Sequence, residues 1–331
     1  QDGILEALNT LATITSRQRN YPLALEQRER VLAIAEQIYP ANHPWIATAL
    51  SNVAFIKRIQ GNYKSVYPQL LRVHDIVLEN FGEQGQMVAG SYINLAATEL
   101  DLGLYERAET SARKSLAIYE SAVGLQGQVA SSLYARLAGA LEGQGQQQAA
   151  ERIWVAALAA VESLPAASQL EAQTGLTWAR LRNQDIAGAG EALEQLQSTI
   201  RSLDEAGASV LPEYRLLAIT ASALLLDAQG QDESAREVLE RVVQDAQAAK
   251  TSETSETGAF QLATVRCWLL ALLYLDRHDE ASTPLALLED SGWRGGPDLR
   301  RYCDRSAEKA AAPEICRRLE RGLFRPADIE S

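Results

Sequence analysis

The sequence contains few of the residues that metal and redox sites use. Its 331 residues include three cysteines, three histidines and one methionine. No two cysteines form a C-x-x-C pair, which excludes the usual zinc-binding and thioredoxin-like motifs. No stretch approaches the roughly 18 apolar residues that a membrane-spanning helix needs. We therefore expect no metal, no cofactor and no direct membrane insertion of this segment.

Positive charge is also scarce. Lysine and arginine together number 31 against 43 acidic residues, which gives a formal net charge of −12. A chain this acidic is repelled by nucleic-acid phosphates, so we expect no nucleic-acid partner. Lysine occurs only five times, and the preference for arginine predicts a bacterial source. Hydrophobic residues at 47% and charged residues at 22% are typical of a folded chain.

Catalytic motifs are missing as well. The sequence has no G-x-x-x-x-G-K-[ST] phosphate loop, no H-E-x-x-H motif and no G-x-S-x-G nucleophile elbow. The spacing of His43, His74 and His278 brings none of them near another histidine or a cysteine. Without an acid–base or nucleophile constellation, we expect no enzymatic activity.

What the sequence does contain is a repeat of about 42 residues. The recurring position, which we call the turn position, is held by Tyr21, Tyr63, Tyr105, Gln147, Ile186, Asp232 and His278. The first four are 42 residues apart, and the later spacings are 39, 46 and 46. Three residues after each comes a short side chain: Ala24, Val66, Ala108, Ala150, Ala189, Ala235 and Ala281. The chain therefore contains seven related units.

Each unit reads as two helices joined by a tight turn. Apolar residues ahead of the turn follow the i, i+3, i+4 spacing of one helix face, as Leu50, Val53 and Ala54 do. A second periodic stretch follows the turn position. Glycines that favour a left-handed helix end stand two residues before it at Gly61, Gly103, Gly145 and Gly230.

This pattern resembles the tetratricopeptide repeat, and its 42-residue period resembles the kinesin-light-chain variety. That variety reads His-Pro, then Ala, then Leu-Asn-Asn-Leu-Ala, and the matching residues here are His43, Pro44, Ala47, Leu50, Asn52 and Ala54. The resemblance implies an all-α fold, a right-handed superhelical solenoid of about seven helix pairs with a C-terminal helical cap. We expect a regular array over 1–163, divergent repeats over 164–292 and capping helices over 293–331.

Stacked helix pairs leave a concave groove that the first helix of each unit lines. Asn52, Asn94 and Arg136 occupy the same position of three successive units. An asparagine within a helix costs about 0.5 kcal/mol relative to alanine, yet its amide can both donate to and accept from a peptide backbone. In the resembled families, asparagine at this position holds the ligand backbone. The alternative interpretation is that both asparagines lie on a wet face without a role.

Other residues are expected beside this row on the groove wall: Asn9, Thr13, Arg17, Ser51, Phe55 and Arg58. The arginines suit an acidic side chain or a terminal carboxylate, and Phe55 offers an apolar contact. For Arg58, a solvated or intrahelical role is an equal alternative.

Two cysteines near the end of the chain are candidates for a disulfide. Cys303 and Cys316 stand thirteen residues apart with Pro313 between them, which suits two short helices that fold back on each other. An oxidising compartment would allow the bond. The alternative is a pair of unrelated thiols.

The sequence therefore predicts a non-enzymatic scaffold that binds a peptide or protein segment in the concave groove. The alternative is an extracytoplasmic sensor or regulatory domain of a larger bacterial signalling protein, such as a membrane-anchored Ser/Thr kinase. The first residue, Gln1, is not methionine, so the natural start has been removed or the chain is an excised piece, and both a cleaved signal peptide and an upstream anchor are compatible with it. This start and the cysteine pair fit an extracytoplasmic sensor, and the same features fit a trimmed cytoplasmic scaffold. Between the two, we expect the periplasm over the cytoplasm. A homo-oligomer is compatible with the sequence.

Overall fold

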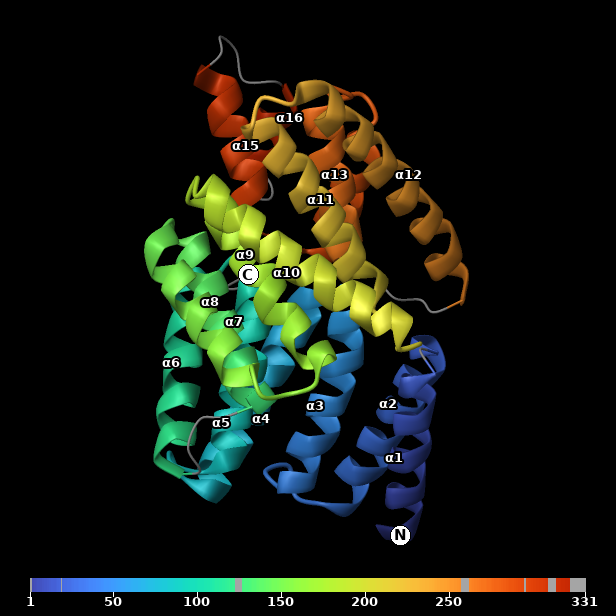
Figure 1. The fold of residues 1–331 in the computed structure, drawn as a ribbon. Coiled ribbons are helices and arrows are strands. Elements are labelled where there is room, and N and C mark those ends of the chain that lie inside the picture. The colour runs from blue at the N-terminus through green and yellow to red at the C-terminus, as the bar shows by residue number, and fades with distance from the viewer. Residues whose placement is uncertain are drawn as a thin grey trace.

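The computed structural model describes residues 2–18, 20–122, 127–256, 262–294, 296–308 and 314–321. Over these residues the chain forms sixteen α-helices and one short 3-10 helix, and it has no strand (Figure 1). The first half contains α1 (Asp2–Arg17), α2 (Tyr21–Ile38), α3 (Pro44–Ile59), α4 (Tyr63–Phe81), α5 (Gln86–Asp101), α6 (Tyr105–Ala122), α7 (Gly127–Gly143) and α8 (Gln147–Val161). The second half contains η1 (Ala166–Gln169), α9 (Leu170–Arg182), α10 (Ile186–Glu205), α11 (Pro212–Ala228), α12 (Asp232–Glu256), α13 (Leu262–Tyr274), α14 (Ser282–Ser291), α15 (Pro297–Glu308) and α16 (Glu314–Arg321).

The helices form seven consecutive pairs, α1/α2 to α13/α14, and α15 and α16 follow them. The predicted fold class, an all-α solenoid of about seven helix pairs with a helical cap, is confirmed. In Figure 1 the first four pairs stand in the lower part of the molecule, α9 and α10 cross its middle, and the later helices lie above. The predicted division at residues 163/164 and 292/293 stays a prediction.

The turn position marks the start of the second helix. In six of the seven units the residue there is the first residue of that helix, as Tyr63 is for α4 and Asp232 is for α12. The residue two positions earlier has a positive φ in every unit from the second to the seventh: Gly61, Gly103, Gly145, Gln184, Gly230 and Asp276. Gln184 and Asp276 adopt the left-handed conformation without glycine, at φ values of 61° and 58°.

The seventh unit departs from this rule. Its second helix, α14, begins at Ser282, four residues after His278. Arg277 binds Glu280 within the intervening turn, with its Nε 2.6 Å from Oε1. Nε2 of His278 is hydrogen-bonded to the hydroxyl of Tyr302 on α15 at 3.0 Å. These contacts hold the segment in a turn, so α14 starts late and is short.

Close helix packing explains the small residue three positions after the turn position. All seven of these residues are buried, and none is more than 3% exposed. A side chain larger than valine would separate the two helices of a pair at the point where they come closest. The repeat that is visible in the sequence is therefore a packing constraint.

The end of the chain folds back onto the early units. Trp293 and Leu299 belong to one buried cluster with Tyr63 and Tyr67 of α4. The backbone N–H of Arg294 donates to the carbonyl of Asp101 at the end of α5, at 2.8 Å. The segment between α14 and α15 therefore crosses back over the array.

Candidate functional site: the inner wall of the solenoid

The first helices of successive pairs form the inner wall. Helices α5, α7, α9, α11 and α13 each pack against the next, whereas no comparable packing joins successive second helices in the described part of the chain. A stack whose first helices are closer together than its second helices curves toward the first helices. Over α5 to α13, the concave face is therefore built from the first helices.

Three of the predicted groove residues form one polar cluster at the N-terminal end of this wall. Oδ1 of Asn9 accepts hydrogen bonds from Nη1 of Arg28 and from Nδ2 of Asn52, the second at 3.4 Å. Nη2 of Arg28 donates to the hydroxyl of Thr13 at 2.9 Å. Arg28 reaches the cluster from α2 and is only 8% exposed. Because Asn52 donates to Asn9 within this cluster, its amide is less available to a ligand than its position in the repeat predicts.

The other N-terminal wall residues face solvent to different degrees. Phe55 is 56% exposed, which is high for so large an apolar side chain. Asn94 and Arg17 are exposed, and Ser51 is half-buried. An exposed Phe55 and Asn94 on neighbouring first helices, α3 and α5, leave an apolar and an amide contact open to a partner.

The two remaining predicted arginines belong to a line of alternating charges. Nε of Arg58 on α3 lies 2.8 Å from Oδ2 of Asp101 on α5. Nη1 of Arg136 on α7 lies 3.5 Å from Oε1 of Glu171 on α9. Burial raises the pKa of Asp101, although Arg58 and Arg136 both act to lower it. Each arginine is therefore already neutralised by a neighbouring unit.

The segment after α14, which we call the clasp (Trp293, Arg294 and Gly296–Arg301), closes one side of the wall. Apart from the bond to Asp101, its main anchor is Asp298. Oδ1 and Oδ2 of Asp298 lie 2.6 and 2.8 Å from Nε and Nη2 of Arg182, at the end of α9. Arg301 also donates to the carbonyl of Leu181. The clasp thus fastens the last unit to the third and fifth.

Arg182 also binds a second carboxylate. Its Nη1 lies 2.7 Å from Oε1 of Glu142 on α7, and both side chains are less than a tenth exposed. Burial alone would raise the pKa of Asp298, but Arg182, with help from Arg266, holds it below its ordinary value. Burial raises the pKa of Glu142. A buried triad of one guanidinium and two carboxylates therefore holds the clasp.

A cavity of about 350 Å³ opens on the wall beside this triad. Its lining comes from helices α7, α8, α9, α11 and α13, and the clasp forms one side through Gly296, Asp298 and Leu299. Two buried polar atoms on its α9 lining, Oγ1 of Thr174 and Nε1 of Trp178, have no hydrogen-bond partner. Both residues are only 6% exposed.

The cavity lies where the row of wall residues changes from large to small. The wall position stands eleven residues before the turn position, and its occupants from the second unit onward are Asn52, Asn94, Arg136, Gly175, Ala221 and Cys267. Gly175 and Cys267 both line the cavity. The sequence predicts a wall position only for the first three of these residues, and the later change to small residues beside the cavity was missed.

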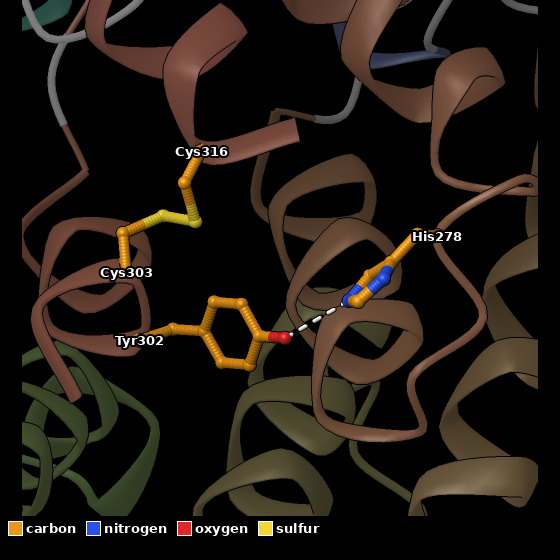
Figure 2. The surroundings of a disulfide bond; sticks show 4 residues. All are labelled: His278, Tyr302, Cys303 and Cys316. Carbon is orange, nitrogen blue, oxygen red and sulfur yellow. Dashed lines mark hydrogen bonds between the residues drawn. A yellow bond between two sulfur atoms is a disulfide. The ribbon is translucent and has the colours of Figure 1, made fainter. Parts of the chain in front are cut away.

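The structure joins Cys303 and Cys316 in a disulfide with their Cα atoms 5.6 Å apart (Figure 2). The bond connects α15 to α16. Figure 2 also shows Tyr302, the neighbour of Cys303, hydrogen-bonded to His278. The remaining cysteine, Cys267, is a buried free thiol.

Two further classes of site are absent from the residues that the structure describes. These residues contain no cluster of three or more His, Cys, Asp or Glu side chains that could hold a metal ion. None of their helices is both long and apolar enough to cross a membrane.

Comparison with known proteins supports the reading of the fold. The tetratricopeptide repeat family matches residues 3–76 and, in an overlapping register, 46–121. No curated protein sequence matches the chain.

Three solved structures share the fold. NprR in complex with its cognate peptide NprX is 14% identical, with a TM-score of 0.65 over 96% of this chain and 84% of its own. A Rap protein complexed with competence and sporulation factor is 12% identical, with a TM-score of 0.56 over 97% and 94%. Nearly identical TPR-like repeats of a Podosopora anserina protein named as a kinesin light chain are 21% identical, with a TM-score of 0.52 over 61% and 97%. The chain therefore matches the tetratricopeptide repeat over residues 3–121, and its helical solenoid has the fold of these structures.

Proposed function

We propose that this chain is a non-enzymatic scaffold that binds a peptide or an extended protein segment along its inner wall. The observation that carries the proposal is the row of side chains at one position of successive first helices. Asn94 in this row is exposed, and the exposed Phe55 lies on the preceding first helix. An open amide and an open aromatic ring offer backbone hydrogen bonds and an apolar contact, which is what an extended peptide needs.

The relatives in fold agree with this proposal. The solved structures of NprR and of the Rap protein are complexes, the first with its cognate peptide NprX and the second with competence and sporulation factor. Both superpose over nearly the whole of this chain. At such low identity they carry the fold and not the ligand, so the partner of this chain has to be found by experiment.

A peptide-binding selection would test the proposal. A displayed peptide library is selected on the wild-type protein, and the affinities of the selected peptides are measured for Asn94→Ala, Phe55→Ala and Asn52→Ala/Asn94→Ala. We expect about a tenfold loss for each, since hot-spot truncations cost about 1–2 kcal/mol or more. Val155→Ala is the control, because this side chain is 48% exposed on α8, a second helix. Equal affinities for wild type and all variants would remove the Asn row and Phe55 from the binding face.

A second candidate function is an extracytoplasmic sensor or regulatory domain of a larger bacterial signalling protein. The disulfide between Cys303 and Cys316 favours it, because such bonds persist in oxidising compartments. The test is thiol labelling of denatured, unreduced protein from its native source. One labelled cysteine per chain supports this candidate, and three labelled cysteines would argue for a reducing compartment.

A further inference from the structure

We propose that the cavity beside Arg182 binds a basic side chain, lysine or arginine, of the peptide that the inner wall holds. This inference rests on the proposed function and names the chemistry of one subsite. It concerns the second half of the array, whereas the residues predicted from the sequence lie mainly in the first half. The shape, the charge and the unpaired polar groups of the cavity each support it.

The size of the cavity suits one large side chain with part of its backbone. At about 350 Å³ it is near the lower end of the roughly 300–1,000 Å³ that is typical of ligand pockets. The row position is held by Gly175 and Cys267 here, where Arg136 stands one unit earlier. The ring of Trp154 packs against Gly175 and bounds the remaining space, which is open to a partner side chain.

The charge of the lining favours a cation. Four carboxylates line the cavity, from Glu142, Glu171, Glu213 and Asp298, against the two guanidiniums of Arg182 and Arg266. Arg136, which pairs with Glu171 at 3.5 Å, adds a third guanidinium beside the lining, so the excess is one negative charge. The chain as a whole has a net charge of −12, so the long-range field attracts a basic partner as well.

Aromatic rings provide a second attraction for a cation. Trp178 and Tyr214 line the cavity together with the acids. The guanidinium carbon of Arg182 already lies 5.8 Å from the centre of the Trp178 ring. This distance is within the range of a cation–π interaction, which is strongest at tryptophan. The environment thus accepts a guanidinium from the protein itself, and a second one from a partner meets the same chemistry.

Two buried polar groups in the same lining have no hydrogen-bond partner. The hydroxyl of Thr174 can donate and accept, and the indole N–H of Trp178 can donate. A buried polar group without a partner costs about 1–3 kcal/mol. The backbone carbonyl and amide on either side of a bound basic residue are suitable partners. Binding therefore removes the free-energy cost of leaving these two groups unpaired in the unbound protein.

Four synthetic peptide pools test the inference. Each pool contains acetylated and amidated heptapeptides with uncharged residues at random in six positions, and the central residue is arginine, lysine, citrulline or glutamate. Citrulline has the shape of arginine without its charge. We expect the arginine and lysine pools to bind about tenfold more tightly than the citrulline pool, as one cation–π contact with an acidic neighbour predicts. The glutamate pool is expected to bind most weakly.

Matched variants separate the cavity from the overall charge. Glu171→Gln/Glu213→Gln removes two negative charges from the lining and should reduce the arginine-to-citrulline preference to about twofold or less. Glu194→Gln/Glu237→Gln makes the same change in net charge at exposed positions of the second helices α10 and α12. This control should keep the preference. Thr174→Val keeps the shape of the side chain, removes its hydroxyl and should weaken all pools alike.

The outcomes are distinct. A preference for arginine over citrulline that is lost only in the cavity variant supports the inference. Pools that bind without such a preference overturn it and leave the peptide-binding proposal in place, as does a preference that survives in the cavity variant. An equal loss of the arginine-to-citrulline preference in both double variants also overturns the inference and leaves the peptide-binding proposal in place. If no pool binds and the library selection also yields nothing, the proposed function fails, and the inference fails with it.

Discussion

The strongest prediction concerns the triad that holds the clasp. Asp298→Asn keeps the size of the side chain and removes the charge that faces Arg182. The two charged hydrogen bonds between them are 2.6 and 2.8 Å long, and the two side chains are 11% and 9% exposed. Removing one partner of a buried ion pair costs about 3–5 kcal/mol. Because Glu142 still neutralises part of the charge of Arg182, we expect about 3 kcal/mol, near the lower bound of that range.

The effect should be local as well as global. Each pair of a solenoid contacts mainly its neighbours, so loosening the clasp need not unfold the array. Urea unfolding followed by circular dichroism measures the global effect. Trypsin digestion followed by mass spectrometry measures the local one, since the clasp contains Arg294, Arg300 and Arg301. Asp298→Asn should be cleaved at these sites before the rest of the chain.

An exposed pair of similar geometry is the control. Asp204 binds Arg215 through both carboxylate oxygens, but the two side chains are 42% and 39% exposed. Solvent screens such a pair, so Asp204→Asn should leave the urea midpoint and the digestion pattern unchanged. If Asp298→Asn behaves like this control, the triad does not hold the clasp and the reasoning from burial is refuted.

Three further predictions test the packing around the inner wall. Gly175→Ala should lower the free energy of unfolding in urea by about 1–3 kcal/mol, because its Cβ would lie 2.4 Å from the ring of Trp154. Gly90→Ala, whose Cβ would have nothing within 4 Å, should be neutral or stabilising, and equal effects of the two variants would contradict this packing. Burial raises the pKa of the Cys267 thiol to about 11. Ellman's reagent at pH 8 should therefore react with this thiol only when urea unfolds the protein. Rapid reaction in the native protein would disprove its burial. Burial lowers the pKa of His74, so its contribution to the stability of the fold is complete above about pH 6.5 and declines as the pH falls below that value. The melting temperature of His74→Gln should therefore fall less than that of the wild type between pH 7.5 and pH 5. An equal fall would show that His74 does not cause this pH dependence.

The sequence was sufficient for everything that depends on neighbouring residues. The turn position, the small residue after it and the glycines with positive φ all reflect contacts within one unit or between adjacent units. These contacts recur at a fixed interval, so they leave a period in the sequence. The positions of Asn52, Asn94 and Arg136 in one row follow from the same period.

The contacts that close the molecule leave no such period. Arg182 and Asp298 are 116 residues apart in the chain, and each occurs once in its role. Asp101 and Arg294 meet through backbone atoms, which no side-chain pattern encodes. The partner of Asn9 and Thr13 was also missed, because the prediction considered first helices only and Arg28 lies on the second helix α2. Single long-range contacts therefore escaped an analysis that was built on repetition.

The cavity shows how the two kinds of information combine. The period shortens from 42 to 39 residues at the fifth unit, and at the same unit the row position becomes Gly175. Trp154 lies against this glycine and admits no side chain there. The clasp then closes the space through Asp298. A change in the local repeat admits the Trp154 ring to the cavity lining, and a contact made by the far end of the chain adds Asp298 to the same lining. The irregular part of the array is therefore where a ligand site distinct from the regular groove can form.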